Sequence, residues 1–534
     1  MAFNVGDIVE VYCRYCPWRS NDKFMVAPNL ACGTQCPRIA RSDGWAKAVI
    51  VEISDKNPLQ TILPQKSELQ STGVWVRTKF LEPIWVDSKG QVLEEKSLFQ
   101  WLSAEGGSLR LFNPSYVPEV SLVAVRWGGS VPVDERRFDF ALSDKLVQEL
   151  LDTVLTRNFE VFTIYIEHSS ELEKVSHLHL FHCLRGKTRL GMYFLWGCNN
   201  DSKPGYVIAS DLIHLMERLE SVGVVTKYPN HSSLYRAITS KEYQSTLCVC
   251  PQFKIPPTVS VPVSLILSSL DSAVANILKS LQTIKKHVQE SDAPIANGVV
   301  KVGNEWMGDG VRAFAGVEDL KAKLLAMLDG AHGPVKSILV QERIPSLVCE
   351  PRVFVFNGKV RGIRYTWNQK EDLKSGRIHA LRTCPQNRAA EELFHGDVAA
   401  QKFVERKIAY LVNEWNVWLL TIGGEIPLFV RMDFLVESLR GSQPGKEGGG
   451  EDAWNYDDGE NGKADPILLP SPELHADDVK YQELFRVWTC ELGEMGSSMV
   501  GFREGKSMLF DAVASSCVCP VVPKRPARAA PKLS

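Results

Sequence analysis

The chain has 534 residues, of which 44% are apolar and 23% are charged. These fractions are ordinary for globular protein and exclude collagen-like, coiled-coil and wholly disordered chains. Its 61 Lys and Arg residues nearly balance its 63 Asp and Glu residues, leaving a formal net charge of −2. A nearly neutral body has no global field for a polyanion, so we do not expect general nucleic-acid binding. At about 150 residues per domain, the length predicts three or four structural units.

The sequence also indicates a compartment. No apolar run approaches the about 18 residues that a membrane-spanning helix needs. The first residues lack the basic region, apolar stretch and cleavage site of a secretory signal. The 13 cysteines are odd in number and widely scattered, which favours reduced thiols over a disulfide framework. We therefore expect a cytoplasmic protein without a membrane anchor, with the nucleus as the alternative.

Residues 1–95 contain short runs that favour β-strands. The runs 5–13, 44–53 and 74–86 are rich in Val, Ile and Trp and are separated by polar loops. Their segments GDIVEVY, GWAKAVIVEI and WVRTKFLEP resemble those of Tudor/Agenet-like SH3-type barrels. The pattern predicts a small N-terminal β-barrel over 1–95, and the resemblance implies a module that can bind a protein or peptide partner.

Two short cysteine pairs lie in this N-terminal region. Cys13 and Cys16 have C-x2-C spacing, and Cys32 and Cys36 have C-x3-C spacing. Such pairs can direct four thiolates at one tetrahedral Zn²⁺, so they are candidate zinc ligands. Ordinary buried thiols are the alternative interpretation.

Four aromatic residues of the same region allow two interpretations. Tyr12, Trp18, Trp45 and Trp75 can form a cage for a methylated ammonium group, as aromatic faces attract cations. They can equally fill the core of a small barrel, which is the more frequent use of large aromatic side chains. We expect the core role, and a cage would add the reading of a modified peptide.

Helical and extended patterns alternate over residues 96–255. Residues 140–155 and 211–224 have the apolar spacing of amphipathic helices, and residues 159–167 have the composition of a strand. Alternating elements of this kind predict an α/β layer.

A helix, a strand and a hairpin are predicted early in residues 256–517. Residues 267–288 have a helical period, and residues 297–303 form an apolar strand pattern. The pair Asn357-Gly358 separates two β-prone runs and suits a tight type I′ turn.

Further along, we predict a helix over 399–415 and a second hairpin around Gly423-Gly424. The two arms of this hairpin are 417–422 and 426–436. The Gly-rich acidic stretch 441–466 has almost no apolar residues, so we predict a disordered insertion. The basic, Pro- and Ala-rich tail 518–534 is expected to be disordered too.

Candidate phosphate-binding residues follow the strand that starts at residue 297. The strand carries Lys301, and Gly303, Gly308 and Gly310 come in the loop after it. Glycines allow backbone N–H groups to approach phosphate oxygens, and the lysine adds a point charge. The loop lacks the Gly-Lys-Ser/Thr ending of a P-loop.

Residues 337–356 predict a strand, a short connector and a second strand, and the connector is a candidate nucleobase hinge. Around Glu342 and Ile344 it can offer backbone donors and acceptors to an adenine edge. Glu350 lies one loop further on and can accept hydrogen bonds from ribose hydroxyls. The alternative is a charged surface loop, which is the usual place for Glu.

Two late strands bring acidic residues together. In the first strand, Arg431 and Asp433 share one face, because residues alternate between faces. In the last strand, the same alternation predicts that Thr489 and Glu491 share a face. Two carboxylates on neighbouring strands can hold Mg²⁺, which keeps several waters and leaves positions for phosphate oxygens. A cross-strand salt bridge to Arg431 is the alternative.

The order of these motifs resembles the C-terminal half of the ATP-grasp superfamily, such as D-alanine–D-alanine ligase and RimK-like ligases. VVKVGNEWMGDGV is similar to its lysine strand and phosphate-covering loop, and ILVQERIP is similar to its adenine hinge. VRMDFLVE and CELGEMGSS resemble its two metal-binding strands. The resemblance implies an α+β multidomain fold, in which the N-terminal barrel precedes an α/β pre-ATP-grasp region (96–255) and an antiparallel ATP-grasp domain (256–517).

The resemblance also implies roles for individual residues and for ATP and magnesium as cofactors. Lys301, the loop glycines and, by a weaker match, Lys241 would contact ATP phosphates. Glu342 and Ile344 would hold adenine, and Glu350 would bind ribose. Asp433 and Glu491 would bind magnesium, and Arg431 would stabilise negative charge at the reacting acyl group. The implied activity joins an unidentified carboxylate substrate to an amine or thiol through an acyl phosphate.

One position departs from the family pattern. The Asn expected two residues after the final glutamate is Gly493 here, and Glu494 follows it. Either Glu494 takes its place at the metal, or the metal site is reduced. The alternative function is therefore a non-catalytic, nucleotide-binding adaptor with a Tudor-like peptide-reading module.

Overall fold

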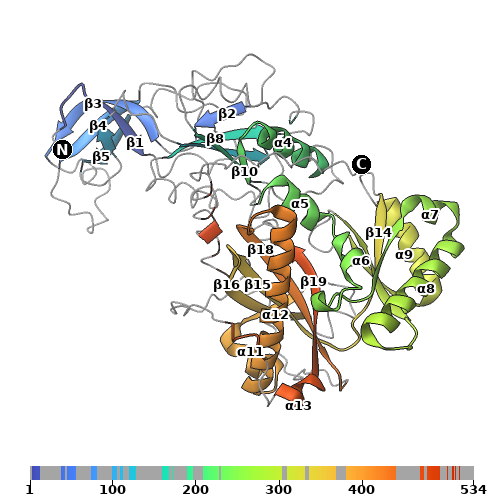
Figure 1. The fold of residues 1–534 in the computed structure, drawn as a ribbon. Helices are drawn as coiled ribbons and strands as arrows, with labels where there is room; N and C mark the ends of the chain where they lie inside the picture. The colour runs from blue at the N-terminus through green and yellow to red at the C-terminus, as the bar shows by residue number, and fades with distance from the viewer. Residues whose placement is uncertain are drawn as a thin grey trace, which may run out of the picture.

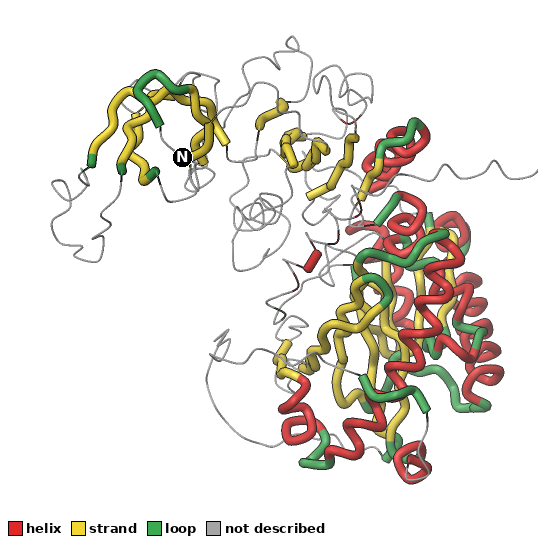
Figure 2. The backbone as a smooth tube through the Cα atoms, turned by 60° about the vertical axis from the view of Figure 1, so that its left-hand side comes forward, coloured by secondary structure: helices red, strands yellow, loops and turns green. Residues whose placement is uncertain are grey.

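The computed structural model describes most of the chain from residue 209 onward and separate strands before it. The described residues are 3–12, 38–41, 45–55, 74–80, 99–104, 109–111, 120–127, 159–166, 172, 189–195, 209–227, 230–303, 310–330, 336–368, 381–440, 469–473, 478–493, 502, 505, 508, 509, 512 and 516. Their strands form four sheets (Figures 1 and 2). The insertion 441–466, the tail 518–534 and the helix expected at 140–155 lie outside these residues.

The first sheet is antiparallel and has the strand order β5-β4-β3-β1-β6. Its strands are β1 (Ile8–Tyr12), β3 (Trp45–Ser54), β4 (Trp75–Phe80), β5 (Phe99–Ser103) and β6 (Leu109–Leu111). The sheet therefore continues past residue 95, where we placed the end of the barrel. The described pairings do not join β5 to β6, so closure into a barrel stays a prediction.

The strand register separates the aromatic residues that we considered for a cage. Trp45 pairs with Tyr12 at one end of β3, whereas Trp75 pairs with Ser54 at the other end. A strand rises about 3.3 Å per residue, so β3 holds the two ends well apart. Trp75 is also buried. Trp75 therefore belongs to the core, and Trp18 lies outside the described residues.

The second sheet is mainly parallel and has the order β10-β9-β7-β8-β2. Its strands are β2 (Arg38–Arg41), β7 (Val120–Trp127), β8 (Phe159–Ile166), β9 (Arg189–Leu195) and β10 (Val225–Lys227). Strand β2 pairs antiparallel with β8, and the other pairs are parallel. Helix α4 (Ala209–Ser221) precedes β10. This parallel sheet agrees with the α/β layer expected from the alternating sequence pattern.

The third sheet is antiparallel and has one face covered by helices. Its order is β11-β14-β12-β13, with β11 (Thr258–Pro262), β12 (Asn297–Val302), β13 (Val311–Ala315) and β14 (Ser337–Glu342). Helices α7 (Val263–Ser268), α8 (Leu270–Gln289) and α9 (Gly316–Gly330) pack their apolar side chains against it. The uncovered face of this sheet is therefore left for the site.

The fourth sheet has the order β17-β16-β15-β18-β19 and is antiparallel throughout. Its strands are β15 (Leu347–Phe356), β16 (Lys359–Asn368), β17 (Leu381–Pro385), β18 (Phe429–Ser438) and β19 (Phe485–Gly493). Helices α11 (Gln386–Leu393) and α12 (Val398–Gly423) cover one face. The hairpin predicted at Asn357-Gly358 is confirmed, because both residues have positive φ, 49° and 72°.

The second predicted hairpin is wrong. Residues 417–422 do not form a strand, because they belong to α12, which is 26 residues long and ends at Gly423. Its buried residues include Val412, Trp415 and Leu419, whose helical spacing packs them against the sheet. An apolar run of six residues has no period that separates a strand from a buried helix end. Gly424, with φ of 70°, then ends the helix in a left-handed conformation.

Four short helical segments complete the described part. Helix α5 (Ser232–Thr239), helix α6 (Tyr243–Leu247) and the 3-10 helix η4 (Pro251–Phe253) connect the second and third sheets, and α13 (Val479–Gln482) precedes β19. Within the described residues, no helix combines the length and the apolar character needed to cross a bilayer.

Candidate functional site

The third sheet contributes a buried lysine to the site. On β12, Val300 and Val302 pack with α8 and α9, so Lys301 between them points from the uncovered face. On β14 the same alternation places Gln341 on that face. The Lys301 Nζ atom donates a hydrogen bond of 2.8 Å to Gln341 Oε1. The two side chains therefore form one polar unit on the face that α8 and α9 leave open.

The fourth sheet contributes a row of charged residues. Arg352 on β15 lies directly opposite Asp433 on β18, and Asp433 lies directly opposite Glu491 on β19. Val430, Met432 and their alternate neighbours pack under α12, so the charged row lies on the other face of the sheet. Directly opposite residues approach to about 5 Å between Cβ atoms. The two acids that the sequence proposed as metal ligands are therefore neighbours.

Arg431 joins these two acids. Its Nε and one Nη atom donate to the two oxygens of Asp433 at 2.7 and 2.6 Å. The same guanidinium lies 3.6 Å from Glu491 Oε1. Asp433 is 1% exposed, so its carboxylate is shielded from water and pairs with Arg431 inside the protein. The salt bridge that the sequence left open as an alternative is present.

Lys241 approaches the same glutamate from another element. It follows α5 with φ of 56°, a left-handed conformation that is uncommon for a lysine. Its Nζ atom lies 3.2 Å from Glu491 Oε2. Burial raises the pKa of Glu491, but the charges of Lys241, Arg431 and Lys301 outweigh it and hold that pKa at about 2. Glu491 is therefore an ionised carboxylate throughout the physiological range.

Burial acts on two further groups. It lowers the pKa of Lys301, an effect that nearby Cys490 and Glu491 partly oppose. It raises the pKa of Glu350, which Arg352 opposes from 2.9 Å. The charge of Glu491 thus acts on the pKa of Lys301, and the charge of Arg352 acts on the pKa of Glu350.

We call seven residues the charged cluster. They are Lys241, Lys301, Glu350, Arg352, Arg431, Asp433 and Glu491. The cluster has four basic and three acidic side chains, drawn from both sheets and from the turn after α5. Its basic excess suits a polyanion, and its two opposed carboxylates suit a divalent cation.

A β-bulge overturns one prediction about β19. The register passes from Asp433 opposite Glu491 to Phe434 opposite Thr489, so Cys490 is the extra residue. Thr489 therefore lies on the helix-covered face, where it accepts a hydrogen bond of 3.0 Å from Trp415 Nε1. Glu491 lies on the opposite face with Arg431. The bulge, which sequence alternation cannot detect, turns the glutamate into the cluster.

The side chains of the two predicted hinge residues, Glu342 and Ile344, do not both face the charged cluster. The side chain of Glu342 points to α8, where Lys285 Nζ donates at 2.5 Å and Gln289 Nε2 at 2.9 Å. Its carboxylate is therefore directed away from the charged cluster, and its N–H donates to Pro257 O. Ile344 is buried beside it. Only main-chain groups of this connector remain candidates for contact with adenine.

Several proposed residues lie outside the described part of the chain. These are Gly308, Glu494 and the four cysteines Cys13, Cys16, Cys32 and Cys36. Gly310 is buried before β13. Gly303 approaches the turn that carries Lys241, since a Cβ there would lie 2.4 Å from Ser240 O. Glycine is required at 303 for that approach.

The sequence did not single out three polar residues that contact the cluster or its strands. Gln341 holds Lys301, and Arg352 holds Glu350. Gln244 donates a hydrogen bond of 3.0 Å to Cys490 O beside Glu491. Strand alternation from Glu350 could have found Arg352, whereas Gln341 lies on another strand than Lys301 and could be found only from the pairing register. No local signal points to Gln244, because its contact spans the two sheets.

The donor set fits magnesium better than zinc. Among the described residues, no group of three or more His, Cys, Asp or Glu side chains could hold a metal ion. Mg²⁺ needs only one or two carboxylates when phosphates and water complete its shell. Asp433 and Glu491 supply such a pair, and a carboxylate has about four lone-pair sites, so the bonds to Arg431 leave acceptor capacity. Zinc at the N-terminal cysteines stays a prediction.

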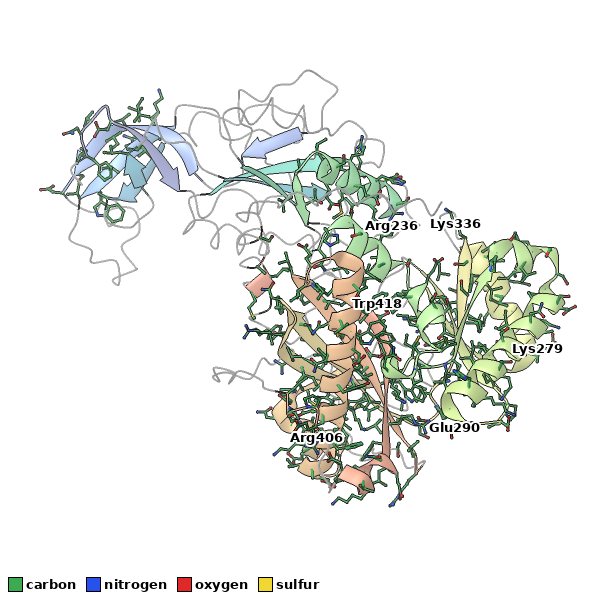
Figure 3. The ribbon with its side chains drawn as sticks, viewed as in Figure 1. Arg236, Lys279, Glu290, Lys336, Arg406 and Trp418 are labelled. Carbon is green, nitrogen blue, oxygen red and sulfur yellow. The ribbon has the colours of Figure 1, made fainter. Side chains whose placement is uncertain are left out.

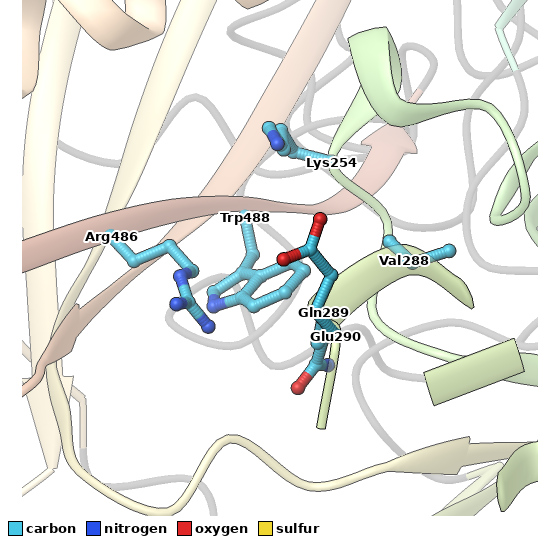
Figure 4. A pocket seen from close by; sticks show the side chains of 6 residues that line it. All are labelled: Lys254, Val288, Gln289, Glu290, Arg486 and Trp488. Atoms are coloured by element: carbon cyan, nitrogen blue, oxygen red, sulfur yellow. The ribbon is translucent and has the colours of Figure 1, made fainter. Parts of the chain in front are cut away.

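A separate cleft lies on the same face of β19, beyond the charged cluster (Figure 4). It encloses about 130 Å³ between β19 and the end of α8. Trp488 lines it and donates to Glu437 at 2.9 Å, and Arg486 lies 5.3 Å from the Trp488 ring. Of the cations that line it, Arg486 lies 3.8 Å from Glu437.

Comparisons with known proteins give a likeness to ligases. No family model matches the chain, and no curated protein matches it significantly. D-cycloserine synthetase DcsG is 13% identical with a TM-score of 0.41, covering 74% of this chain and 99% of that one. D-alanine–D-alanine ligase from Bacillus anthracis, complexed with ATP, is 12% identical with a TM-score of 0.40, covering 74% and 97%.

A third similar structure is named an ATP-grasp ligase. PsnB, complexed with a phosphomimetic variant of a minimal precursor, Mg and ADP, is 12% identical with a TM-score of 0.36. It covers 75% of this chain and 100% of that chain. All these TM-scores lie below 0.5, so we base the function proposed for this chain on its own side chains.

Proposed function

We propose that this chain binds ATP together with magnesium between its third and fourth sheets and uses it to ligate a carboxylate. The observation that carries the proposal is the charged cluster, in which two buried basic groups, Lys301 and Arg431, and two half-buried ones adjoin two opposed carboxylates. Burying charges of both signs is costly unless they pair or bind ions. The basic groups match a triphosphate in sign, and the two opposed carboxylates match a divalent cation in sign.

Each part of the cluster has a role in this proposal. Lys301 and Lys241 bind phosphate oxygens, and main-chain groups near Ile344 contact adenine. Glu350 accepts hydrogen bonds from the ribose. Asp433 and Glu491 hold the magnesium ion, with Glu494 as a further candidate. When bound, magnesium supplies positive charge that stabilises the transferring phosphoryl group.

The proposed reaction has two steps. A carboxylate oxygen of the substrate attacks the γ-phosphorus of ATP, the bond to the β-phosphate oxygen breaks, and ADP leaves. An amine or thiol then attacks the acyl carbon, the acyl–oxygen bond breaks, and inorganic phosphate leaves with the electron pair. Arg431 stabilises negative charge at the acyl centre through the charge of its guanidinium, whose position is fixed by the contacts with Asp433 and Glu491.

A second candidate is a nucleotide-binding adaptor without turnover. The observation that favours it is Gly493, which ends β19 opposite Arg431 and offers no side-chain ligand. A metal shell with one protein ligand fewer would bind the nucleotide but position it less firmly for transfer. Under this alternative, the N-terminal sheet would provide the contact with a peptide.

The test is an ATP titration with and without magnesium, followed by phosphate release with pooled carboxylates and amines. We expect magnesium-dependent ATP binding by the full chain, and phosphate release identifies the ligase over the adaptor. Lys301→Met should weaken ATP binding by about a hundredfold, as expected for losing a buried charged contact to phosphate. Lys321→Met is the matched control, since Lys321 pairs with Asp271 and Glu318 on the helix-covered side. Absence of ATP binding by the wild-type protein would refute both candidates.

A further inference from the structure

β19 is the edge strand of the fourth sheet, and its outer edge is closed by the segment 243–254. An edge strand leaves backbone N–H and C=O groups unpaired unless other groups cover them. Here the Leu492 N–H donates to Tyr243 Oη at 2.8 Å, and the Thr489 N–H donates to Lys254 O at 2.8 Å. The Cys490 carbonyl, at the bulge, accepts from Gln244 Nε2 at 3.0 Å. The segment thus fixes the backbone on both sides of Glu491.

Tyr243 is itself held firmly. Its ring packs edge-on against Trp415 and tilted against Trp418, with centroid distances of 5.6 and 5.5 Å. Trp418 lies on α12 facing this segment (Figure 3). Burial raises the pKa of the Tyr243 hydroxyl, so it stays protonated. The hydroxyl oxygen that accepts from Leu492 therefore has a position set by the helix that supports the sheet.

Gln244 contacts both sheets of the site. Its amide nitrogen donates to the bulge carbonyl on the fourth sheet, and its amide oxygen lies 3.5 Å from Gln341 Nε2 on the third. Gln341 in turn accepts from Lys301 and donates to Thr258 Oγ1 at 2.8 Å. Gln244 is 1% exposed, so these amide contacts are shielded from water. One side chain therefore links the strand of Glu491 to the partner of Lys301.

We infer that Gln244 and Tyr243 are positioning residues that set Glu491 and Lys301 at a fixed separation, so that the two sheets bind one ligand through its phosphates and its metal. Neither residue needs to touch that ligand. The inference rests on the proposed function, because it assigns Glu491 to the magnesium end of the nucleotide. Groups that orient a metal ligand typically change metal affinity by about ten- to a hundredfold when removed.

The experiment measures how strongly magnesium improves ATP binding. The dissociation constant of ATP is determined by calorimetry in excess EDTA and in excess magnesium, and the ratio of the two is the readout. Gln244→Met keeps the length of the side chain but removes the donor to Cys490 O. We expect this variant to reduce the ratio at least about tenfold relative to wild type. A loss of general stability alone would weaken both measurements and leave the ratio unchanged.

Gln401→Met is the matched control. Gln401 is also a buried glutamine, and its amide donates to Gln386 O at 2.8 Å, within the helices that cover the fourth sheet. The Gln401→Met variant should lose about as much stability as Gln244→Met and should keep the wild-type ratio of dissociation constants. Tyr243→Phe is a second test that keeps the ring packing; it should reduce the ratio in the same direction, since the Leu492 N–H loses its acceptor.

The outcomes separate the two levels of the proposal. A wild-type protein that binds ATP with magnesium, together with unchanged ratios in both Gln244→Met and Tyr243→Phe, overturns this inference and leaves the proposed function standing. A wild-type protein that binds no ATP overturns both. If Gln244→Met does not fold, the ratio of Tyr243→Phe decides.

Discussion

Two buried arginine–aspartate pairs occupy different regions of the same fold. Arg406 lies on α12 (Figure 3) and meets Asp478 just before α13. Its Nε and one Nη atom each donate to one carboxylate oxygen of Asp478. Arg431 meets Asp433 in the same two-point manner, but it also approaches Glu491. The first pair joins a helix to the segment before β19. The second is part of a cluster that collects charges from both sheets.

Under the proposed function, the difference between the two regions separates buried charges that tie elements together from buried charges that bind a ligand. At Arg406 the guanidinium pairs with the carboxylate of Asp478 and ties two elements together, which is sufficient to explain their burial. At Arg431 the acids are adjacent to one another, and basic groups arrive from separate elements. Like charges placed directly opposite on a sheet are destabilising. Arg431 and Lys241 offset this repulsion, and the magnesium ion of the proposed function would offset it further.

The largest effect on stability should come from the region of Arg406. Arg406→Ala leaves the carboxylate of Asp478 buried without its two-point partner, and we expect the free energy of unfolding to fall by about 3–5 kcal/mol. Denaturant unfolding followed by tryptophan fluorescence measures it. ATP affinity of the folded protein should stay at the wild-type value. A loss below about 1 kcal/mol would show that the two regions are not as different as their geometry suggests.

The second effect concerns binding rather than stability. Asp433→Asn keeps the shape of the side chain and removes the charge, so we expect magnesium-dependent ATP affinity to fall about a hundredfold, or about 2.7 kcal/mol. Arg431 retains Glu491 at 3.6 Å as a partner, so the free energy of unfolding should fall less than in Arg406→Ala. Calorimetric titration with and without magnesium checks the affinity. Unchanged magnesium dependence would remove Asp433 from the metal site.

The smallest effect is a pH dependence of stability. The pKa of Glu491 is lowered from an ordinary 4.5 to about 2, so the ionised carboxylate stabilises the folded state above pH 4.5. That contribution is lost as the pH falls from 4.5 towards 2. Glu491→Gln should therefore be less stable than wild type at pH 7, and the gap between the two should narrow by pH 4. Urea unfolding at pH 7, 5 and 4 measures the difference in stability between the two proteins. A difference that does not change with pH would contradict the pairing of ionised Glu491 with its basic neighbours.

Much of the fourth sheet could be predicted from local sequence. Arg431 and Asp433 were expected on one face because residues alternate along a strand, and β18 has no bulge of its own that disturbs them. The turn at Asn357-Gly358 was expected because few residues accept two successive positive φ values. These features depend on neighbours in the chain, which the sequence contains directly.

The sequence by itself determined the strands of Lys301, Asp433 and Glu491, because side-chain chemistry and alternation are local properties. The tertiary structure decided how these residues meet. The bulge at Cys490 turned Glu491 towards Arg431, the packing of α12 against the sheet extended that helix through residues predicted as a strand, and Gln244 joined two sheets far apart in the chain. Such features follow from pairing register and from backbone groups that need partners, and both are fixed only when distant segments come together.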